Sequence, residues 1–377
     1  MRRGPSIFWW EKETTRECIS HIKKKSKHFL SLAPFCYTCV SFLAMTATLT
    51  TTATPSSSSS NSNNNNSTAE EVEQLGITTI SSFTANAQAQ GWMEVSLLAL
   101  QDDDDNNNNN NSNNNNNAKQ QQQPAASLGE RLLLGHSVVL LAPSHNFVTN
   151  AQRRQIIADS LQLADATEPT DFETTGRRRL PTIEAANRAA AATANTECGT
   201  PLDEATNDLV QTCYQRIAAY LDQTWPEAIQ VLFGNDDDDD DDDDDSDNEK
   251  VMTSLSTLMQ TDQLQYASRE PAINIYRAPG GAFDAHQDDE TLTALICLSV
   301  PEHDFQGGGT VFWEPKKCSS SAAPVVMIRP PAGTVMLFGG TVTHAACAVT
   351  AGCRVMAVSS FGKKQQEEED EPTSYLY

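Results

Sequence analysis

Two histidines and an aspartate in the C-terminal third of the chain have residue types and a spacing suited to binding one metal ion. His286 and Asp288 are two positions apart in the segment FDAHQDDE, residues 283–290. On a β-strand, side chains two positions apart project from the same face, so both can reach one ion. His344 follows a predicted strand and a Gly-Gly turn, and a returning strand would bring it beside this pair. Two imidazoles and one carboxylate on one side of a metal leave the opposite positions open, which is typical of non-haem Fe(II).

Arg354 is the fourth candidate because it begins the strand pattern RVMAVSSF, in which it shares a face with Met356 and Val358. If that face points inward, a guanidinium enters an apolar core and needs an anion, since an unpaired buried charge is very costly. A planar guanidinium binds a carboxylate through two parallel hydrogen bonds. We therefore expect a small dicarboxylate that chelates the metal at one end and reaches Arg354 with the other. 2-Oxoglutarate has that shape.

The elements that must position these residues are short strands. β-Branched or alternating runs separated by Gly, Pro and Asp turns predict strands over residues 272–277, 291–300, 310–313, 325–329, 334–338 and 354–361. Gly307 to Gly309 are predicted to reverse a hairpin, and residues 330–333 to form a tight connection. The spacing is typical of a sandwich or barrel, so the expected fold class is α+β, mainly β, with an antiparallel core.

Helical patterns precede the strands and are expected to support the β-core. Apolar residues at helical spacing predict a helix from Asn150 to Leu163, with Asn150 as its N-cap. A second helix is predicted from Leu209 to Leu221, before the interruption at Trp225-Pro226. The three arginines at 177–179 are interpreted first as a loop and second as a patch that faces a substrate.

Composition predicts a single ordered domain within the 377 residues, over residues 130–362. Ser, Asn, Asp and Gln tracts dominate residues 50–129, which carry too few apolar groups to offset chain entropy and are expected to be a disordered linker. The net charge of −24 is concentrated in such tracts. They include an acidic insert at 235–249, expected to be a solvated surface loop, and an acidic tail at 363–377. Without a basic stripe interleaved with aromatic residues, nothing favours a nucleic-acid partner.

The N-terminus predicts a membrane anchor or a signal segment. Residues 29–49 carry no charge, and a basic leader, residues 1–28, places four lysines directly before them. That length just suffices for a helix to cross a bilayer, and the lysines predict a cytosolic N-terminus with the C-terminal domain in the lumen of the endoplasmic reticulum or Golgi. The alternative is an unstructured arm on a cytoplasmic protein. The nine cysteines do not decide the compartment, although Cys347 and Cys353 would be able to pair in an oxidising lumen.

Three segments resemble the core of the 2-oxoglutarate- and Fe(II)-dependent dioxygenases and, among these, the prolyl 4-hydroxylase-like branch. They are YRAPGGAFDAHQDD, TLTALICLSVPEHDFQGGGTVFW and RPPAGTVMLFGGTVTHAACAVTAGCRVMAVSSF, and they span residues 270–362 approximately. The resemblance implies a double-stranded β-helix, or jelly-roll, core in which His286, Asp288 and His344 bind iron. It also implies that Arg354 holds the distal carboxylate of 2-oxoglutarate. Tyr276 matches a position where some relatives place a tyrosine that lines the active site.

The same resemblance implies decarboxylation of 2-oxoglutarate to succinate and CO2, coupled to hydroxylation of a C–H bond, with L-ascorbate as reductant. An apolar wall that limits water is expected, from strand alternation, to include Leu295, Val335, Leu337 and Val358. The expected substrate is a peptidyl proline in a proline-rich peptide or protein. Peptidyl lysine is the next alternative, followed by a small molecule.

Two departures from the branch keep these alternatives open. Cys297 stands where prolyl hydroxylases often have a tyrosine that contacts the co-substrate, and the basic residue is Arg354 where collagen-type enzymes tend to have lysine. GGGTVFW and the final segment also resemble the lysyl hydroxylase branch. From other classes, a non-catalytic metal-binding interaction module and a cupin-like metalloenzyme remain alternatives.

Overall fold

The computed structural model describes seven ranges of the chain: residues 77–98, 126–169, 176–192, 199–234, 252–288, 290–315 and 323–364. The chain divides into two units, residues 1–61 and 62–377, and every described residue belongs to the second. The predicted leader, the uncharged segment at 29–49, the acidic insert and the acidic tail from residue 365 onward lie outside the described ranges. Within those ranges, no helix has the length and apolar character needed to cross a membrane.

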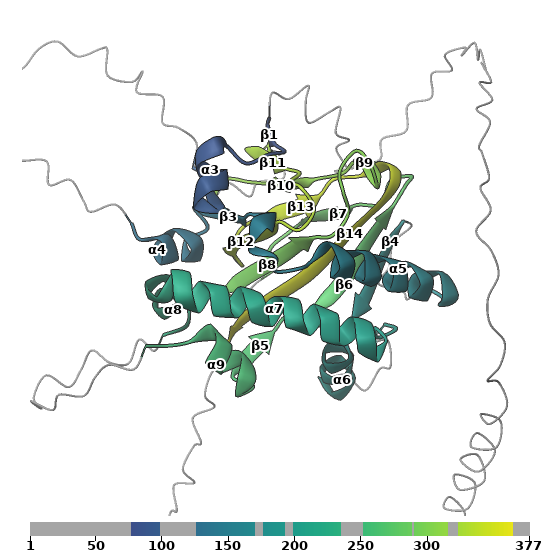
Figure 1. Ribbon diagram of the computed structural model, residues 1–377, viewed down its shortest axis with the longest axis horizontal. Coiled ribbons are helices and arrows are strands. Elements are labelled where there is room, and N and C mark those ends of the chain that lie inside the picture. Colours follow the sequence, from purple (N-terminus) through teal and green to yellow (C-terminus); the bar gives the residue numbers. More distant parts are fainter. Residues whose placement is uncertain are drawn as a thin grey trace, which may run out of the picture. The chain divides into compact units, whose positions relative to one another are not determined.

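Two β-sheets form the centre of the described unit (Figure 1). The larger sheet runs in the order β2 (Trp92–Ser96), β3 (Ser137–Leu141), β12 (Val335–Gly339), β8 (Leu292–Cys297), β14 (Val349–Lys363), β6 (Ala272–Arg277) and β4 (Arg177–Pro181), and β5 (Leu264–Tyr266) and β9 (Phe305–Gly307) also pair with β14. The smaller sheet runs β1 (Thr78–Ile80), β11 (Val326–Ile328), β10 (Thr310–Phe312), β13 (His344–Ala346) and β7 (Phe283–His286). Among these described strands only β1 and β11 pair in parallel. The expected α+β class, mainly β with a jelly-roll core, is confirmed.

Helices cover the outer face of the larger sheet. In Figure 1, α5 (Asn150–Ala166), α7 (Glu204–Thr224) and α8 (Pro226–Phe233) lie across that face, and their apolar side chains share one core with it. The remaining described helices are short: α3 (Ala85–Gln90), α4 (Leu128–Leu133), a 3-10 turn (Pro143–His145), α6 (Ile183–Ala192) and α9 (Leu255–Gln260). Both long helices predicted from apolar spacing are present, and Pro226 begins α8 instead of only ending α7.

The N-cap of α5 differs from the prediction. Thr149, not Asn150, is the cap: its hydroxyl accepts a hydrogen bond from the Gln152 backbone N–H, and the Gln152 side chain accepts one from the Thr149 backbone N–H. This reciprocal capping box satisfies two backbone donors at once, an arrangement that Asn150 one position later would not provide.

Alternating side chains of the larger sheet belong to two separate apolar cores. For two residues this contradicts the predicted apolar wall of the active site. Met336 pairs with Leu295 across the β12–β8 ladder, and both belong to the core between the two sheets. Val335 and Leu337 belong instead to the core beneath the helices. The prediction that these two residues line the active site is therefore wrong. Because side chains alternate along a strand, a one-residue error in register moves a whole set to the opposite face.

The predicted linker at 50–129 is wrong for residues 77–98 and for the start of α4. Residues 92–96 form β2, which pairs with β3, and residues 78–80 form β1, which pairs with β11. Val95 is 8% exposed and Leu97 is fully buried. The apolar alternation in this segment is short and lies between long polar tracts, so the composition of residues 50–129 as a whole predicted disorder.

Two turn and loop predictions also differ from the structure. Arg177 to Arg179 are not a loop but begin β4, which pairs with β6. Gly307 to Gly309 do not close a hairpin, because β9 pairs with β14 whereas β10 pairs with β11 and β13. These three glycines carry the chain from one ladder to another, with φ values of 67°, 62° and 126° that side chains with a Cβ rarely adopt. Cys347 and Cys353, considered as a pair, are both free thiols.

Candidate metal centre

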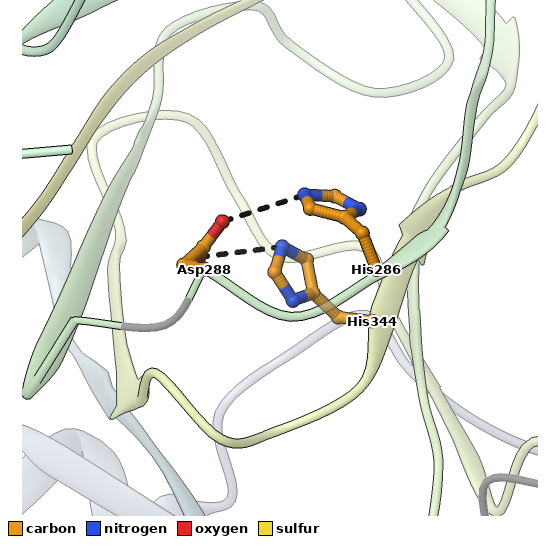
Figure 2. A group of neighbouring side chains, drawn as sticks. All are labelled: His286, Asp288 and His344. Carbon is orange, nitrogen blue, oxygen red and sulfur yellow. Dashed lines mark ion pairs between the residues drawn. The ribbon is translucent and has the colours of Figure 1, made fainter. Parts of the chain in front are cut away.

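Three predicted ligands converge where the smaller sheet ends. His286 is the last residue of β7 and His344 is the first of β13, and the antiparallel register sets them opposite each other. Asp288 lies two residues beyond the end of β7, not within the strand as expected. Its Oδ1 is 3.4 Å from His286 Nε2 and its Oδ2 is 3.7 Å from His344 Nε2, as Figure 2 shows. The candidate ligand atoms all lie within 4.8 Å of one another.

Backbone carbonyls orient both imidazoles toward a shared ion. His286 Nδ1 lies 2.8 Å from the Asp284 carbonyl oxygen, and His344 Nδ1 lies 3.1 Å from that of Val342. A carbonyl only accepts, so each Nδ1 carries a proton, and Nε2 is the ring nitrogen that faces Asp288 and is left to bind an ion. Metal-binding histidines are typically held in this way, with the other ring nitrogen donating to a carbonyl or carboxylate. The donor set therefore fits a divalent transition metal.

The protonation states also suit a metal. Burial lowers the pKa of His344 to about 4, against the opposing effect of the nearby Asp288 charge. Burial acts to raise the pKa of Asp288, but the hydrogen bond with His286 and the proximity of His344 outweigh it and hold that pKa below its usual value. At neutral pH the site thus holds an ionised carboxylate and an uncharged His344 ring, the forms in which these groups bind metals.

The three side chains line one pocket together with Arg354. The pocket wall comes from both sheets and also includes Tyr276, Leu295, Thr310, Met356 and Val358. Leu295 and Val358 were predicted for this wall, and Tyr276 was predicted to line the site. All three line the pocket in the structure.

Arg354 is buried and donates hydrogen bonds to two neutral acceptors. The residue is 3% exposed, its Nη1 donates to the Gly309 carbonyl at 2.8 Å, and its Nη2 donates to Thr310 Oγ1 at 2.8 Å. Its guanidinium carbon lies 5.7 Å from the centre of the Tyr276 ring. In the described part of the chain, no carboxylate forms an ion pair with Arg354. Two of the five guanidinium N–H groups are used by these bonds, so a carboxylate entering the pocket can take two others.

Sequence reasoning missed polar residues of this pocket, among them Glu270 and Asn274, whereas the second interpretation of the arginines at 177–179, a patch that faces a substrate, agrees with the place of Arg179 in the pocket wall. Glu270 forms an ion pair with Arg179, and both line the pocket. Burial raises the pKa of Glu270, while the Arg179 charge opposes that change. Asn274 lines the pocket from the same strand face as Tyr276, and that two-residue spacing is a signal that would have found it. Glu270 lies between a turn and a proline, where no periodic pattern exists to indicate its orientation.

The sequence of this region matches a known family. Residues 271–361 match the model of the 2OG-Fe(II) oxygenase superfamily. The predicted relationship to this superfamily is confirmed over that stretch. The matched residues include four residues of the pocket, the candidate metal ligands His286, Asp288 and His344 together with Arg354.

Solved oxygenases with similar chain traces include three prolyl hydroxylases. The viral collagen prolyl hydroxylase from Paramecium Bursaria Chlorella virus-1, in its 2OG complex, is 12% identical with a TM-score of 0.31, over 58% of this chain and 93% of that chain. A prolyl-4-hydroxylase from Pseudomonas putida is 13% identical with a TM-score of 0.35, over 63% and 97%. A prolyl hydroxylase from Trichoplax adhaerens, in complex with a hypoxia inducible factor peptide fragment, is 11% identical with a TM-score of 0.36, over 62% and 87%. No curated protein sequence matches the chain.

Proposed function

We propose that this protein is an Fe(II)- and 2-oxoglutarate-dependent dioxygenase that hydroxylates a peptidyl proline. One observation carries the proposal: a triad of metal-binding character lines the same pocket as a buried arginine that has no counter-ion among the described residues. A dicarboxylate that chelates a metal at one end would satisfy both, because it supplies the anion that Arg354 otherwise lacks.

Each pocket residue has a distinct part in this reaction. Bound Fe(II) with 2-oxoglutarate supplies the oxidising chemistry, which releases succinate and CO2 as the C–H bond is hydroxylated. His286, Asp288 and His344 hold the metal on one side and leave the other side to the co-substrate and O2. Arg354 orients the distal carboxylate. The apolar side chains of the wall exclude water, which strengthens electrostatic interactions in the pocket. L-Ascorbate is proposed as the reductant that keeps the iron in its ferrous state.

The charges of the pocket favour an uncharged acceptor. Among the described residues of its wall, only Glu270 and Asp288 are acidic. Asp288 serves the metal, and the Glu270 carboxylate already accepts from Arg179 and from the Ser360 backbone N–H. A lysyl ammonium entering this pocket would find no unused carboxylate in the described wall, and an unpaired buried charge is costly. This supports proline over lysine as the acceptor.

Two further parts of the proposal rest on sequence. A proline-rich peptide or secreted protein is the proposed partner. The uncharged segment at 29–49, with lysines before it, supports a membrane-held domain in the lumen of the secretory pathway.

In the test, the full chain is incubated with Fe(II), 2-oxoglutarate and ascorbate under three matched conditions. The first contains a proline-rich peptide, the second contains the same peptide with lysine in place of each proline, and the third contains no peptide. Mass spectrometry follows the gain of one oxygen atom, and succinate is measured in parallel. We expect the proline peptide alone to gain oxygen, one for each succinate formed.

Oxygen gain on the lysine peptide would show that the proposed acceptor is wrong while the dioxygenase stands. Metal binding without consumption of 2-oxoglutarate in any condition would contradict the dioxygenase function. The non-catalytic metal-binding module and the cupin-like metalloenzyme would then be the remaining hypotheses.

A further inference from the structure

We propose that Thr293 is a positioning residue of the metal centre, whose hydroxyl fixes the orientation of the Asp288 carboxylate and is itself held by Ser360. The inference rests on the proposed function, because it concerns a ligand of the proposed iron site. Thr293 belongs to β8 of the larger sheet, whereas Asp288 follows β7 of the smaller sheet. The interaction therefore links a ligand outside regular structure to the central ladder of the fold.

The geometry is that of a charge-assisted hydrogen bond. Thr293 Oγ1 lies 2.6 Å from Asp288 Oδ2, within the range of 2.5–2.7 Å expected when a hydroxyl donates to a carboxylate. Thr293 is fully buried, so bulk water does not compete for its hydroxyl. With Oδ2 held in this way, Oδ1 remains turned toward His286 Nε2, 3.4 Å away.

Proton counting gives the direction of the next bond. Thr293 Oγ1 also lies 3.0 Å from Ser360 Oγ, and the two residues are direct partners across the β14–β8 ladder. A hydroxyl has one proton, and a metal-binding carboxylate can only accept. Thr293 must therefore give its proton to Asp288, and the Ser360 hydroxyl must supply the proton of the second bond. Hydrogen bonds aligned in this sense strengthen one another.

The far end of this chain is anchored by charge. The Ser360 backbone N–H donates to Glu270, and Glu270 forms the ion pair with Arg179 described above. Ser360 is fully buried and Glu270 is 4% exposed. This arrangement gives the buried Glu270 a role that the dioxygenase reaction does not assign to it: it fixes the strand position from which Ser360 orients Thr293.

Asp288 needs such support because its own strand does not provide it. The residue lies past the end of β7, and its backbone N–H donates to the Gly340 carbonyl at 3.0 Å, which fixes the main chain but not the carboxylate. Residues that hydrogen-bond to metal ligands typically change metal affinity by about 10- to 100-fold when they are substituted. We expect a loss of that size when the Thr293 hydroxyl is removed.

The test measures Fe(II) affinity of the full chain by anaerobic calorimetry, without 2-oxoglutarate or peptide. Thr293→Val removes the hydroxyl and keeps the β-branched shape, Thr293→Ser keeps the hydroxyl, and Ser360→Ala removes the second donor. Thr334→Val is the matched control: Thr334 is also fully buried, and its hydroxyl has no hydrogen-bond partner among the described residues. Thermal unfolding of each metal-free variant shows whether the fold is retained.

We expect Thr293→Val to weaken Fe(II) binding by about 10- to 100-fold. Ser360→Ala should weaken it less, and Thr293→Ser and Thr334→Val should bind as the parent does. Parent-like affinity in both Thr293→Val and Ser360→Ala would overturn the positioning role while leaving the iron site intact. If Thr293→Val does not fold, parent-like Fe(II) binding by Ser360→Ala alone would overturn the proposal that Ser360 and Thr293 together orient the Asp288 carboxylate. A parent chain that binds no Fe(II) would overturn the proposed function and this inference together.

Discussion

Replacing Arg354 with methionine separates its role in binding from its effect on folding. Methionine has a similar length and no charge. In the protein without co-substrate, Arg354 is 3% exposed, and within the described residues its guanidinium donates to the Gly309 carbonyl and the Thr310 hydroxyl. Removing an uncompensated buried charge should therefore leave the metal-free fold at least as stable as the parent, since a hydrophobic replacement of similar volume is often neutral or stabilising.

Co-substrate binding should change in the opposite direction. Arg354 has N–H groups left for two bonds to a carboxylate. A hydrogen bond that involves a charged group contributes about 1.5–3 kcal/mol, so the loss of two such bonds costs about 3–6 kcal/mol. At 1.4 kcal/mol for each factor of ten, the dissociation constant of 2-oxoglutarate should rise by about 10²- to 10⁴-fold. Arg354→Lys keeps the charge but not the planar fork and should show an intermediate loss.

Calorimetric titration of 2-oxoglutarate into the Fe(II)-loaded protein without oxygen measures this change directly. Arg329→Met is a suitable control, because Arg329 directly follows β11 and already forms an ion pair with Glu302. Unchanged affinity in Arg354→Met, or a large loss of metal-free stability in that variant, would refute the reasoning that this arginine awaits an external carboxylate.

Three other predictions follow from burial. His344 has its pKa lowered from 6.5 to about 4 by burial, so the unfolded chain binds the extra proton between these values and the stability of the metal-free protein should fall as pH drops through that window. The free energy of unfolding, measured with urea, should fall by about 3 kcal/mol across this window in the parent and should not show this fall in His344→Gln. The same pH dependence in both proteins would contradict the prediction. Burial raises the pKa of Cys297 to about 12. Its thiol should therefore resist iodoacetamide at pH 8 in the native protein and react in urea. Rapid labelling of the native protein would show that Cys297 is accessible to solvent. Leu97→Ala should destabilise the protein by about 2–5 kcal/mol, because Leu97 is fully buried, whereas a change within error would indicate that residues 77–98 are dispensable.

The convergence of the candidate ligands was predictable from sequence for a physical reason. The spacing of His286 and Asp288 and the strand patterns before His344 depend on local periodicity, and antiparallel pairing of β7 with β13 then places the histidines opposite each other. Arg354 was predictable because alternation along its strand gives it the same face as Met356 and Val358, which also line the pocket.

Other features depend on information that periodicity does not contain. The choice of Val335 over Met336 for the wall was wrong because both residues are apolar, so only the pairing register decides which one faces the other sheet. Glu270 reaches the site through a contact with the distant Arg179, whereas Thr293 contacts Asp288 five positions away, and neither position carries a local pattern that indicates its partner.

The most direct test of the account is the conversion of 2-oxoglutarate to succinate by the full chain in the presence of Fe(II), ascorbate, O2 and the proline-rich peptide. His286→Ala and Asp288→Ala remove single ligands, and His303→Ala, at an exposed histidine, is the matched control. The account predicts succinate from the parent and from His303→Ala, none without Fe(II), and none from either ligand variant. Succinate formed at the parent rate by His286→Ala or Asp288→Ala would show that the chemistry occurs elsewhere, and its absence from the iron-loaded parent would contradict the dioxygenase function.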